Sequence, residues 1–223
     1  MFDINKIMSD LVKERPIFHS EADFQFALAW KIQNTYREAK IWLEKSVRGL
    51  EGTNFKDDKN RYIDILVTID DKEIPIELKY KTRNNSKEPM KFENEEYNLK
   101  NQGAQDNGRY DFLKDISRIE NFINSSSSKS DYGYAIIFTN DHLYYESGEN
   151  SNSSQFRIDK NIKIIESGEH DWNFESESFK KYNSKRIDAI NLINSYNVEW
   201  QDCSTLLDDK DNKFKYLIVT ITK

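Results

Sequence analysis

The sequence has few of the residues that build disulfide frameworks and zinc sites. Cys203 is the only cysteine in 223 residues, which excludes an intramolecular disulfide and a multi-thiolate metal site. The three histidines, His19, His142 and His170, are widely separated in the sequence, and this spacing does not favour a zinc site. Because a chain without a disulfide framework suits a reducing compartment, we expect the protein in the cytoplasm.

Long apolar runs are also missing. No window approaches the roughly 20 apolar residues that cross a membrane. The opening segment MFDINKIMSDLVKER carries acids early and has no apolar run, unlike a signal peptide. Hydrophobic residues still make up 37% of the chain, enough for a buried core. We expect one domain over 1–223, with a core over about 15–140 and a β-rich C-terminal extension over about 141–223.

The net charge of -6 argues against a nonspecific nucleic-acid coat protein, but it is compatible with one local basic strip. The segment 79–91 is such a strip, because it holds five basic residues against the single acid Glu88, and five minus one gives +4. These five are Lys79, Lys81, Arg83, Lys87 and Lys91. A phosphate-binding strip and a solvated loop are equally compatible with this pattern.

Hydrophobic periodicity predicts an α/β fold. Residues 20–23 (Ser-Glu-Ala-Asp) are typical of a capping box that opens a helix. Phe24, Leu28 and Ile32 then recur at helical spacing, which predicts a helix that ends near Tyr36. A second helix is expected to follow Gly108.

The remaining core elements are expected to be strands. A helix between two strands implies a crossover and a parallel pair, so the sheet should be mixed and flanked by helices, in the order α-β-β-β-α-β with extra C-terminal strands. Residues 184–195 fit a helix and a strand equally well. Strands are expected over 41–47, 62–70, 72–82, 132–140, 161–166, 197–203 and 214–222, and loops over 49–60 and 148–155.

The two strands over 62–82 form the clearest hairpin, and each has one apolar face. In the first strand, the aliphatic residues at odd positions from Ile63 to Ile69 share a face, and Asp64 lies on the other. In the second strand, the aliphatic residues at even positions share a face, and Glu77 and Lys79 lie opposite them. Both strands therefore present a charged face.

The hairpin loop has two possible positions. A two-residue loop at 70–71 sets Asp64 opposite Glu77, and a loop at 71–72 sets Asp64 opposite Lys79. Both bring the three charged residues onto one face. A shift by one residue would place aliphatic side chains against charges, so burial selects this arrangement.

Two facing carboxylates predict a metal site. Directly opposed side chains lie about 5 Å apart at Cβ, where Asp64 and Glu77 repel each other unless a cation lies between them. Hard oxygen ligands suit Mg²⁺ or Mn²⁺, and the carbonyl of Leu78 can complete the shell. Glu21 adds a third acid: it shares a helix face with Phe24, which favours an inward position, although an acid in a first helical turn also suits the helix dipole.

These residue types suit phosphodiester hydrolysis. A divalent cation neutralises the developing charge and lowers the pKa of a bound water. Asp64 and Glu77 would hold that cation, and Lys79 would orient the water and hold the phosphate. The bland alternative is a half-exposed hairpin with salt-bridged charges. The capped helix before the hairpin and the helix–strand unit after it favour the catalytic interpretation.

The set Asp64, Glu77-Leu78-Lys79 and Glu21 resembles the active-site signature of the PD-(D/E)XK nuclease superfamily, which has the restriction-endonuclease-like fold. The segments RPIFHSEADFQFALAW and GRYDFLKDISRIE resemble an uncharacterised prokaryotic branch of it, and the resemblance covers about residues 15–140. It departs at one position, where Ile63 replaces the proline of the motif's name.

The resemblance implies a metal-dependent nuclease acting on nucleic acid, DNA in the first place, in defence, repair or mobile-element biology. Mg²⁺ or Mn²⁺ would bind Asp64, Glu77 and the Leu78 carbonyl, with Lys79 catalytic and Glu21 auxiliary. Two rival hypotheses are a non-catalytic nucleic-acid-binding module and a protein-interaction module on the same fold. The oligomeric state is open, with a homodimer as one option.

Four further residues are candidates for substrate contact: Lys81, Arg83, Gln102 and Arg109. Arg109 begins the second helix, where a phosphate contact is plausible. The alternative is that Asp111, Asp115 and Arg118, with Arg109, form ordinary ion pairs on the helix surface, and the sequence favours this second interpretation. Pro75 lacks a ladder donor and leaves the hairpin register uncertain.

Overall fold

A computed structural model describes residues 2–47, 62–84, 88–146, 151–173, 186–203 and 213–223. The predicted loop over 49–60 and residue Lys87 of the basic strip lie outside these ranges. Within them, no helix is both long and apolar enough to cross a membrane.

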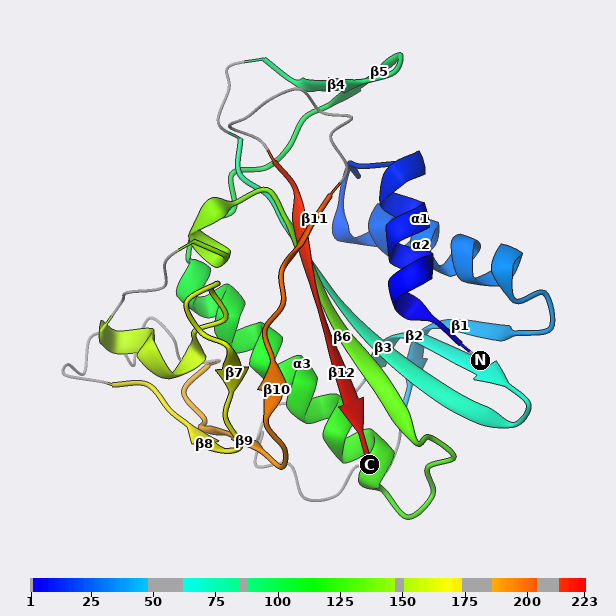
Figure 1. Cartoon of the computed structure of the whole chain (residues 1–223), viewed down its shortest axis with the longest axis vertical. Coiled ribbons are helices and arrows are strands. Elements are labelled where there is room, and N and C mark those ends of the chain that lie inside the picture. Colours follow the sequence, from blue (N-terminus) through cyan, green and yellow to red (C-terminus); the bar gives the residue numbers. More distant parts are fainter. Residues whose placement is uncertain (1, 48–61, 85–87, 147–150, 174–185, 204–212) are drawn as a thin grey trace.

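A six-stranded mixed sheet forms the centre of the molecule (Figure 1). Neighbouring strands are antiparallel except β3 and β6, which are parallel and are connected through α3. The parallel pair predicted from the helix between two strands is therefore confirmed. The strand order is β1 (Lys40–Ser46), β2 (Tyr62–Ile69), β3 (Lys72–Lys81), β6 (Tyr132–Thr139), β12 (Lys215–Thr222) and β11 (Gln201–Asp202).

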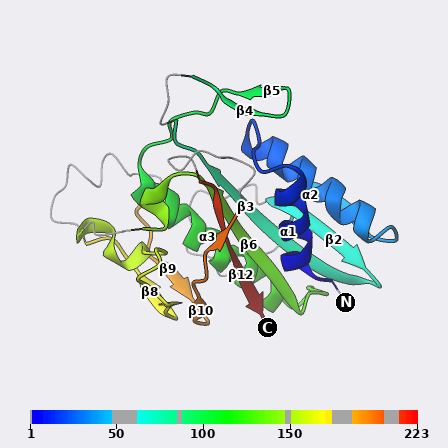
Figure 2. The ribbon, with the colours of Figure 1, turned by 45° about the horizontal axis from the view of Figure 1, so that its top comes forward.

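Three α-helices of the described chain flank this sheet. Helices α1 (Ile4–Glu14) and α2 (Glu21–Thr35) cover one face, and α3 (Gln105–Asn124) runs along the other (Figures 1 and 2). Two hydrophobic clusters match these layers: one joins α1 and α2 to the sheet, and the other joins α3 to the opposite face. The predicted α/β class, with a mixed central sheet flanked by helices, is confirmed.

The capping prediction for α2 is also confirmed. The Ser20 side chain accepts a hydrogen bond from the Asp23 backbone N–H at 3.1 Å, and the helix ends at Thr35. Helix α1 had no predicted counterpart. Its buried residues Ile4, Ile7, Met8, Leu11 and Val12 recur three or four positions apart, which is the spacing of a helix face packed on a core.

The hairpin between β2 and β3 adopts the first of the two possible registers. Ile69 pairs with Lys72, so Asp70 and Asp71 form the loop, and both have positive φ (49° and 61°). Positive φ at both loop residues is the geometry of a type I′ turn, whose twist suits a two-residue hairpin. Continuing this register beyond its last recorded pair sets Asp64 opposite Glu77.

One predicted face is wrong at Ile63. Ile65 and Val67 belong to the cluster under α1 and α2, as expected, but Ile63 belongs to the cluster under α3. The alternation breaks at Asp64, and its β1 neighbour Glu44 has a φ of 49° within an otherwise regular strand pair. This left-handed residue turns the pair locally, so the side chains beyond it exchange faces.

The C-terminal region differs from the expected strands mainly in their length. Residues 184–195 contain a strand, β9 (Ile190–Leu192), and no helix in the described part of that segment. The other short strands are β7 (Ile164–Ile165), β8 (Gly168–His170) and β10 (Tyr196–Asn197). Two 3₁₀ turns are η1 (His142–Tyr144) and η2 (Ser151–Phe156), and η2 overlaps the predicted loop over 148–155.

Two elements near the site also differ from expectation. The polar stretch after β3 contains a small hairpin of β4 (Met90–Phe92) and β5 (Glu95–Tyr97). Helix α3 begins at Gln105, earlier than the Gly108 start that the sequence suggested.

At Gly133 in β6, side chains of α3 and β3 leave no room for a Cβ. A Cβ there would lie 2.7 Å from the Ile119 side chain and 2.7 Å from the Pro75 ring. We expect Gly133→Ala to lower the free energy of unfolding by about 1–3 kcal/mol through overpacking. Urea denaturation measures this, with Gly103→Ala as the control, because a Cβ at Gly103 meets no atom within 4 Å. Equal midpoints for the two variants would contradict the packing assigned to β3 and β6.

Candidate active site

The candidate site lies where the regular pairing of β2 and β3 ends. Past the pair of Ile65 and Ile76, side-chain carboxylates meet the amides of β3. The Leu78 N–H donates to Asp64 Oδ2 at 2.7 Å, and the Tyr80 N–H donates to Glu21 Oε2 at 2.7 Å. Asp64 from β2 and Glu21 from α2 are therefore both fixed against the backbone of the strand that carries Glu77 and Lys79.

Glu77 is directed away from this edge, toward α3. Its carboxylate is buried, with the residue only 1% exposed. Oε1 accepts a hydrogen bond from Arg118 Nη1 at 2.9 Å. Oε2 is also buried and has no hydrogen-bond partner among the described residues. A buried carboxylate oxygen without a partner is costly and marks a position where a cation or donor is expected.

Lys79 lies on the same side of β3 as Glu77 and contacts an acidic residue of α3, Asp115. Its Nζ donates to the Leu78 carbonyl at 3.1 Å and forms an ion pair with Asp115 Oδ2 at 2.6 Å. Arg118 Nη2 lies 3.7 Å from Asp115 Oδ1. Two acids and two bases thus alternate in one buried cluster, which balances its own charge. Asp64 and Glu21 add two further negative charges beside it.

The pKa values in the cluster follow from burial. Burial, together with Asp115 and Glu21, raises the pKa of Asp64 to about 6, although Lys79 and the Leu78 amide act in the opposite direction. Burial raises the pKa of Glu77 well above its usual range, against the opposing effect of Arg118. Burial therefore disfavours the charged form of both acids, and added positive charge nearby would favour it.

Lys79 shifts in the other direction. Burial lowers the pKa of its ammonium, but Asp115, Glu21, Asp64 and Glu77 outweigh burial and raise it above the usual value. Lys79 is therefore a cation at neutral pH, in accordance with the general effect of nearby opposite charge.

The donor set suits a hard divalent cation. Asp64, Glu77 Oε2 and the Leu78 carbonyl supply only oxygen atoms, which is the preference of Mg²⁺ and Mn²⁺. Added positive charge would give Glu77 Oε2 a partner and would lower the raised pKa of Asp64. Among the described residues, no group of three or more His, Cys, Asp or Glu side chains is arranged to hold a metal.

A small cavity lies beside Asp64 on the α2 side of the sheet. It has a volume of about 150 Å³. Gln25 links its walls by donating to Glu44 Oε1 at 3.0 Å and to the Asp64 carbonyl at 2.7 Å. No residue pattern signalled Gln25 or Glu44, because their contact depends on the turn at Glu44. The lining residues are Glu21, Ala22, Gln25, Glu44, Asp64 and Leu78.

Three of the four predicted substrate-binding residues have structural contacts away from the carboxylates. Arg83 Nη1 lies 3.6 Å from the buried Asp141. Gln102 pairs with Thr82 through both its backbone and its side chain. Arg109 is buried and donates to the Leu143 carbonyl at 2.5 Å. These contacts tie the end of β3 and the start of α3 to the segment after β6.

The fourth predicted residue, Lys81, is half-buried at the end of β3. The basic strip that begins at Lys79 is not a uniformly positive surface where the structure describes it. Lys79 is paired with Asp115, and Lys91 forms an ion pair with Glu96 at 2.9 Å. Its charge is therefore largely offset by neighbouring acids.

Asp115 and Arg118 were interpreted from the sequence as surface ion pairs with Asp111, and this was wrong. Asp111 instead binds Arg186 through two bonds of 2.7 and 2.8 Å. Asp115 is 2% exposed and lies in the cluster described above. One signal was present: Asp115 lies four positions before Ile119, on the same side of the predicted helix, where a charged residue needs a buried partner.

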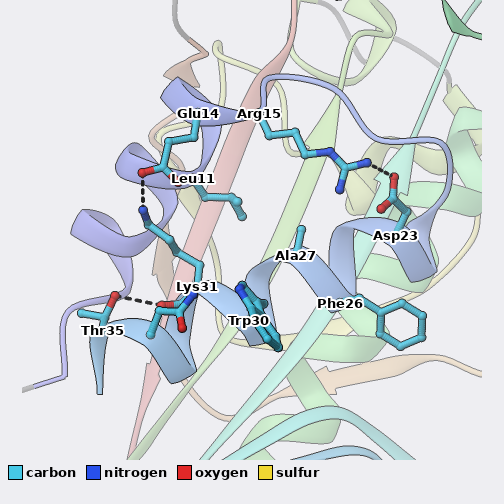
Figure 3. A pocket seen from close by; sticks show the side chains of 10 residues that line it. Leu11, Glu14, Arg15, Asp23, Phe26, Ala27, Trp30, Lys31 and Thr35 are labelled. Carbon is cyan, nitrogen blue, oxygen red and sulfur yellow. Dashed lines mark hydrogen bonds and ion pairs between the residues drawn. The ribbon is translucent and has the colours of Figure 1, made fainter. Parts of the chain in front are cut away.

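A second hollow lies between α1 and α2, outside the carboxylate cluster (Figure 3). It is a groove of about 780 Å³. Phe26 and Trp30 line it and are 57% and 72% exposed. Two ion pairs cross its rim, Glu14 with Lys31 and Arg15 with Asp23, and both are drawn in Figure 3.

Comparison with protein-family models, curated proteins and solved structures gave no match to this chain.

The raised pKa of Asp64 predicts a pH-dependent stability. The folded protein holds this proton up to about pH 6, whereas an unfolded chain releases it near the ordinary value of 3.8. The folded state thus binds more protons between these values, so in EDTA the free energy of unfolding should fall as pH rises from about 4 to 6. Asp64→Asn should be more stable than wild type at pH 7, by about 1–3 kcal/mol, since each pKa unit corresponds to about 1.4 kcal/mol.

Denaturant titrations at a series of pH values measure this difference. Asp71→Asn is the control, because Asp71 is exposed in the hairpin loop and asparagine tolerates its positive φ. A gap between wild type and Asp64→Asn that does not grow with pH would show that Asp64 is not held protonated.

Proposed function

We propose that this protein is a metal-dependent nuclease with a restriction-endonuclease-like fold, hydrolysing phosphodiester bonds in nucleic acid, DNA in the first place. The observation that carries the proposal is the buried Glu77 carboxylate with one oxygen unpartnered, in electrostatic contact with Asp64 and Lys79. If these charges had no function, we would expect them on the exposed surface of the hairpin. Exposed ion pairs contribute only about 0–1 kcal/mol to the free energy of unfolding.

The burial of the charged cluster favours a catalytic role over ordinary surface ion pairing. Removing two acids and two bases from water costs several kcal/mol per ion, and apolar residues of similar volume are often at least as stable. The cluster of Glu77, Lys79, Asp115 and Arg118 is therefore poorly explained by stability alone. Chemistry at the site explains it better, because preorganised charges in a dry site act strongly on a reacting phosphate.

The residues have distinct roles in this proposal. Asp64, Glu77 Oε2 and the Leu78 carbonyl hold the divalent cation. When bound, Mg²⁺ or Mn²⁺ supplies charge neutralisation and acidifies a bound water. Lys79 stays protonated and holds a phosphate oxygen or orients the attacking water. Glu21, fixed on the Tyr80 amide, adds negative charge at the edge of the site.

The same resemblance supports further proposals about the substrate, the compartment and the biological role. The substrate is nucleic acid, the compartment is the cytoplasm, and the biology is defence, repair or mobile elements. A homodimer would allow two such sites to act on two strands.

Glu77→Gln tests the metal site without a change in shape. The amide removes the charge while keeping the hydrogen-bond acceptor that faces Arg118. We expect Mn²⁺ affinity, measured by calorimetry, to fall by more than the roughly 10–100-fold typical for loss of an outer-shell partner. Cleavage of plasmid DNA with Mg²⁺ should fall with it.

Glu73→Gln is the matched control, because Glu73 lies on the same strand at the hairpin end, opposite Thr68. It should bind Mn²⁺ and cut like wild type. Equal Mn²⁺ affinity for Glu77→Gln and wild type would reject the metal site. Wild type that binds Mn²⁺ but cuts neither DNA nor RNA would reject the nuclease assignment alone.

One observation favours a second candidate, a protein-interaction module. The exposed Phe26 and Trp30 side chains lie along the groove between α1 and α2, and exposed aromatic clusters of this kind often mark interaction surfaces. This candidate predicts that the carboxylate variants leave biological activity intact, whereas Trp30→Ala abolishes it. The nuclease candidate predicts the reverse, and a complementation assay in the host separates them.

A further inference from the structure

Lys79 has two partners, and only one of these contacts is expected to persist when the divalent cation binds. Its Nζ contacts the Leu78 carbonyl at 3.1 Å and Asp115 Oδ2 at 2.6 Å. The Leu78 carbonyl is also a proposed ligand of the divalent cation. A cation bound there repels the lysine ammonium, so the contact between Lys79 and this carbonyl weakens when the site is loaded. Asp115 is then the partner that retains Lys79.

The position of the Asp115 carboxylate is restricted by the packing of α3 and by Arg118. It belongs to α3, which packs along the sheet through a continuous face of buried residues, including Ile116 and Ile119. Asp115 itself is 2% exposed, and its other oxygen faces Arg118 at 3.7 Å. A carboxylate on a packed helix, flanked by a guanidinium, has little freedom to follow a mobile lysine.

Lys79 needs such a partner. A lysine side chain is a flexible four-carbon stem that carries about 2 kcal/mol of rotamer entropy. Catalysis requires a reacting or orienting group to lie within a fraction of an ångström of its productive position, and small misplacements cost large factors in rate. The strand backbone fixes where the stem starts, but it does not fix where the ammonium ends.

We propose that Asp115 is the positioning residue for Lys79. It holds the ammonium toward the position of the reacting phosphate, in a site where the Leu78 carbonyl would bind the divalent cation. The inference rests on the proposed nuclease function and adds α3 to the catalytic machinery. Asp115 touches neither metal nor substrate in this assignment, and its effect on the rate comes through Lys79.

Asp111 provides a matched control on the same helix. It lies one turn before Asp115 and forms its own bidentate ion pair with Arg186, so its substitution removes a comparable ionic contact of α3. An effect specific to Asp115 cannot then be attributed to general loosening of the helix.

The experiment compares Asp115→Asn, Asp115→Glu and Asp111→Asn with wild type. Single-turnover cleavage of plasmid DNA is measured with saturating Mg²⁺, and Mn²⁺ affinity is measured by calorimetry without DNA. Asp115→Asn should lower the rate by about 10²-fold, with a much smaller change in Mn²⁺ affinity and with the KM for DNA unchanged. Asp115→Glu should recover part of the rate because it restores the carboxylate, and Asp111→Asn should cut like wild type.

A spectroscopic readout tests the contact without any reaction. The Lys79 ammonium should give a ¹⁵N–¹H signal protected from solvent exchange in metal-free wild type. This signal should be lost in Asp115→Asn and kept in Asp111→Asn. Lys79→Ala, which lacks the ammonium, identifies the signal.

The outcomes separate this inference from the proposed function. If wild type cuts DNA and Asp115→Asn cuts at the same rate, the positioning role is wrong and the nuclease assignment stands. A loss of Mn²⁺ affinity equal to the loss of rate would also overturn it, since Asp115 would then act on the metal. If wild type cuts no nucleic acid, the nuclease assignment fails first and the positioning role fails with it.

Discussion

A carboxylate buried as deeply as that of Glu77 has to be met by positive charge, because an isolated ion in a protein interior costs many kcal/mol. Arg118 meets one oxygen, and this contact ties β3 to α3. Lys79 and Asp115 repeat the arrangement one step along the strand. The position of α3 on the sheet is therefore fixed by charge as well as by apolar packing, and the site depends on both.

The opening of the β2–β3 hairpin has a complementary effect on the other acids. Where strand pairing ends, the amides of β3 still need acceptors, because buried backbone donors are seldom left unpaired. Asp64 and Glu21 supply these acceptors at Leu78 and Tyr80. The same bonds that satisfy the backbone hold the carboxylates in place. The end of regular pairing between β2 and β3 thus brings Asp64 from β2 and Glu21 from α2 to the same stretch of β3.

The sequence was sufficient for features that depend on local pattern and insufficient for those that depend on distant partners. Alternation in β3 predicted that Glu77 and Lys79 share a face, and the Ser20 cap predicted the start of α2. The exchange of faces at Ile63 required the left-handed conformation of Glu44, which no residue pattern signalled. The partner of Asp115 could not be identified from the sequence either, since Lys79 lies 36 positions earlier on another element (115 − 79 = 36).

The place of β12 in the sheet has a consequence for how the molecule forms. This strand pairs with β6 along its full length, and β6 in turn pairs with β3. Until β12 arrives, β6 presents an unpaired apolar edge, since its residues from Gly133 to Thr139 are buried in the finished fold. Contacts between strands so far apart in sequence form slowly and leave such edges open to association. During synthesis, β3 therefore lies in an unfinished sheet that is sensitive to aggregation until β12 has been added.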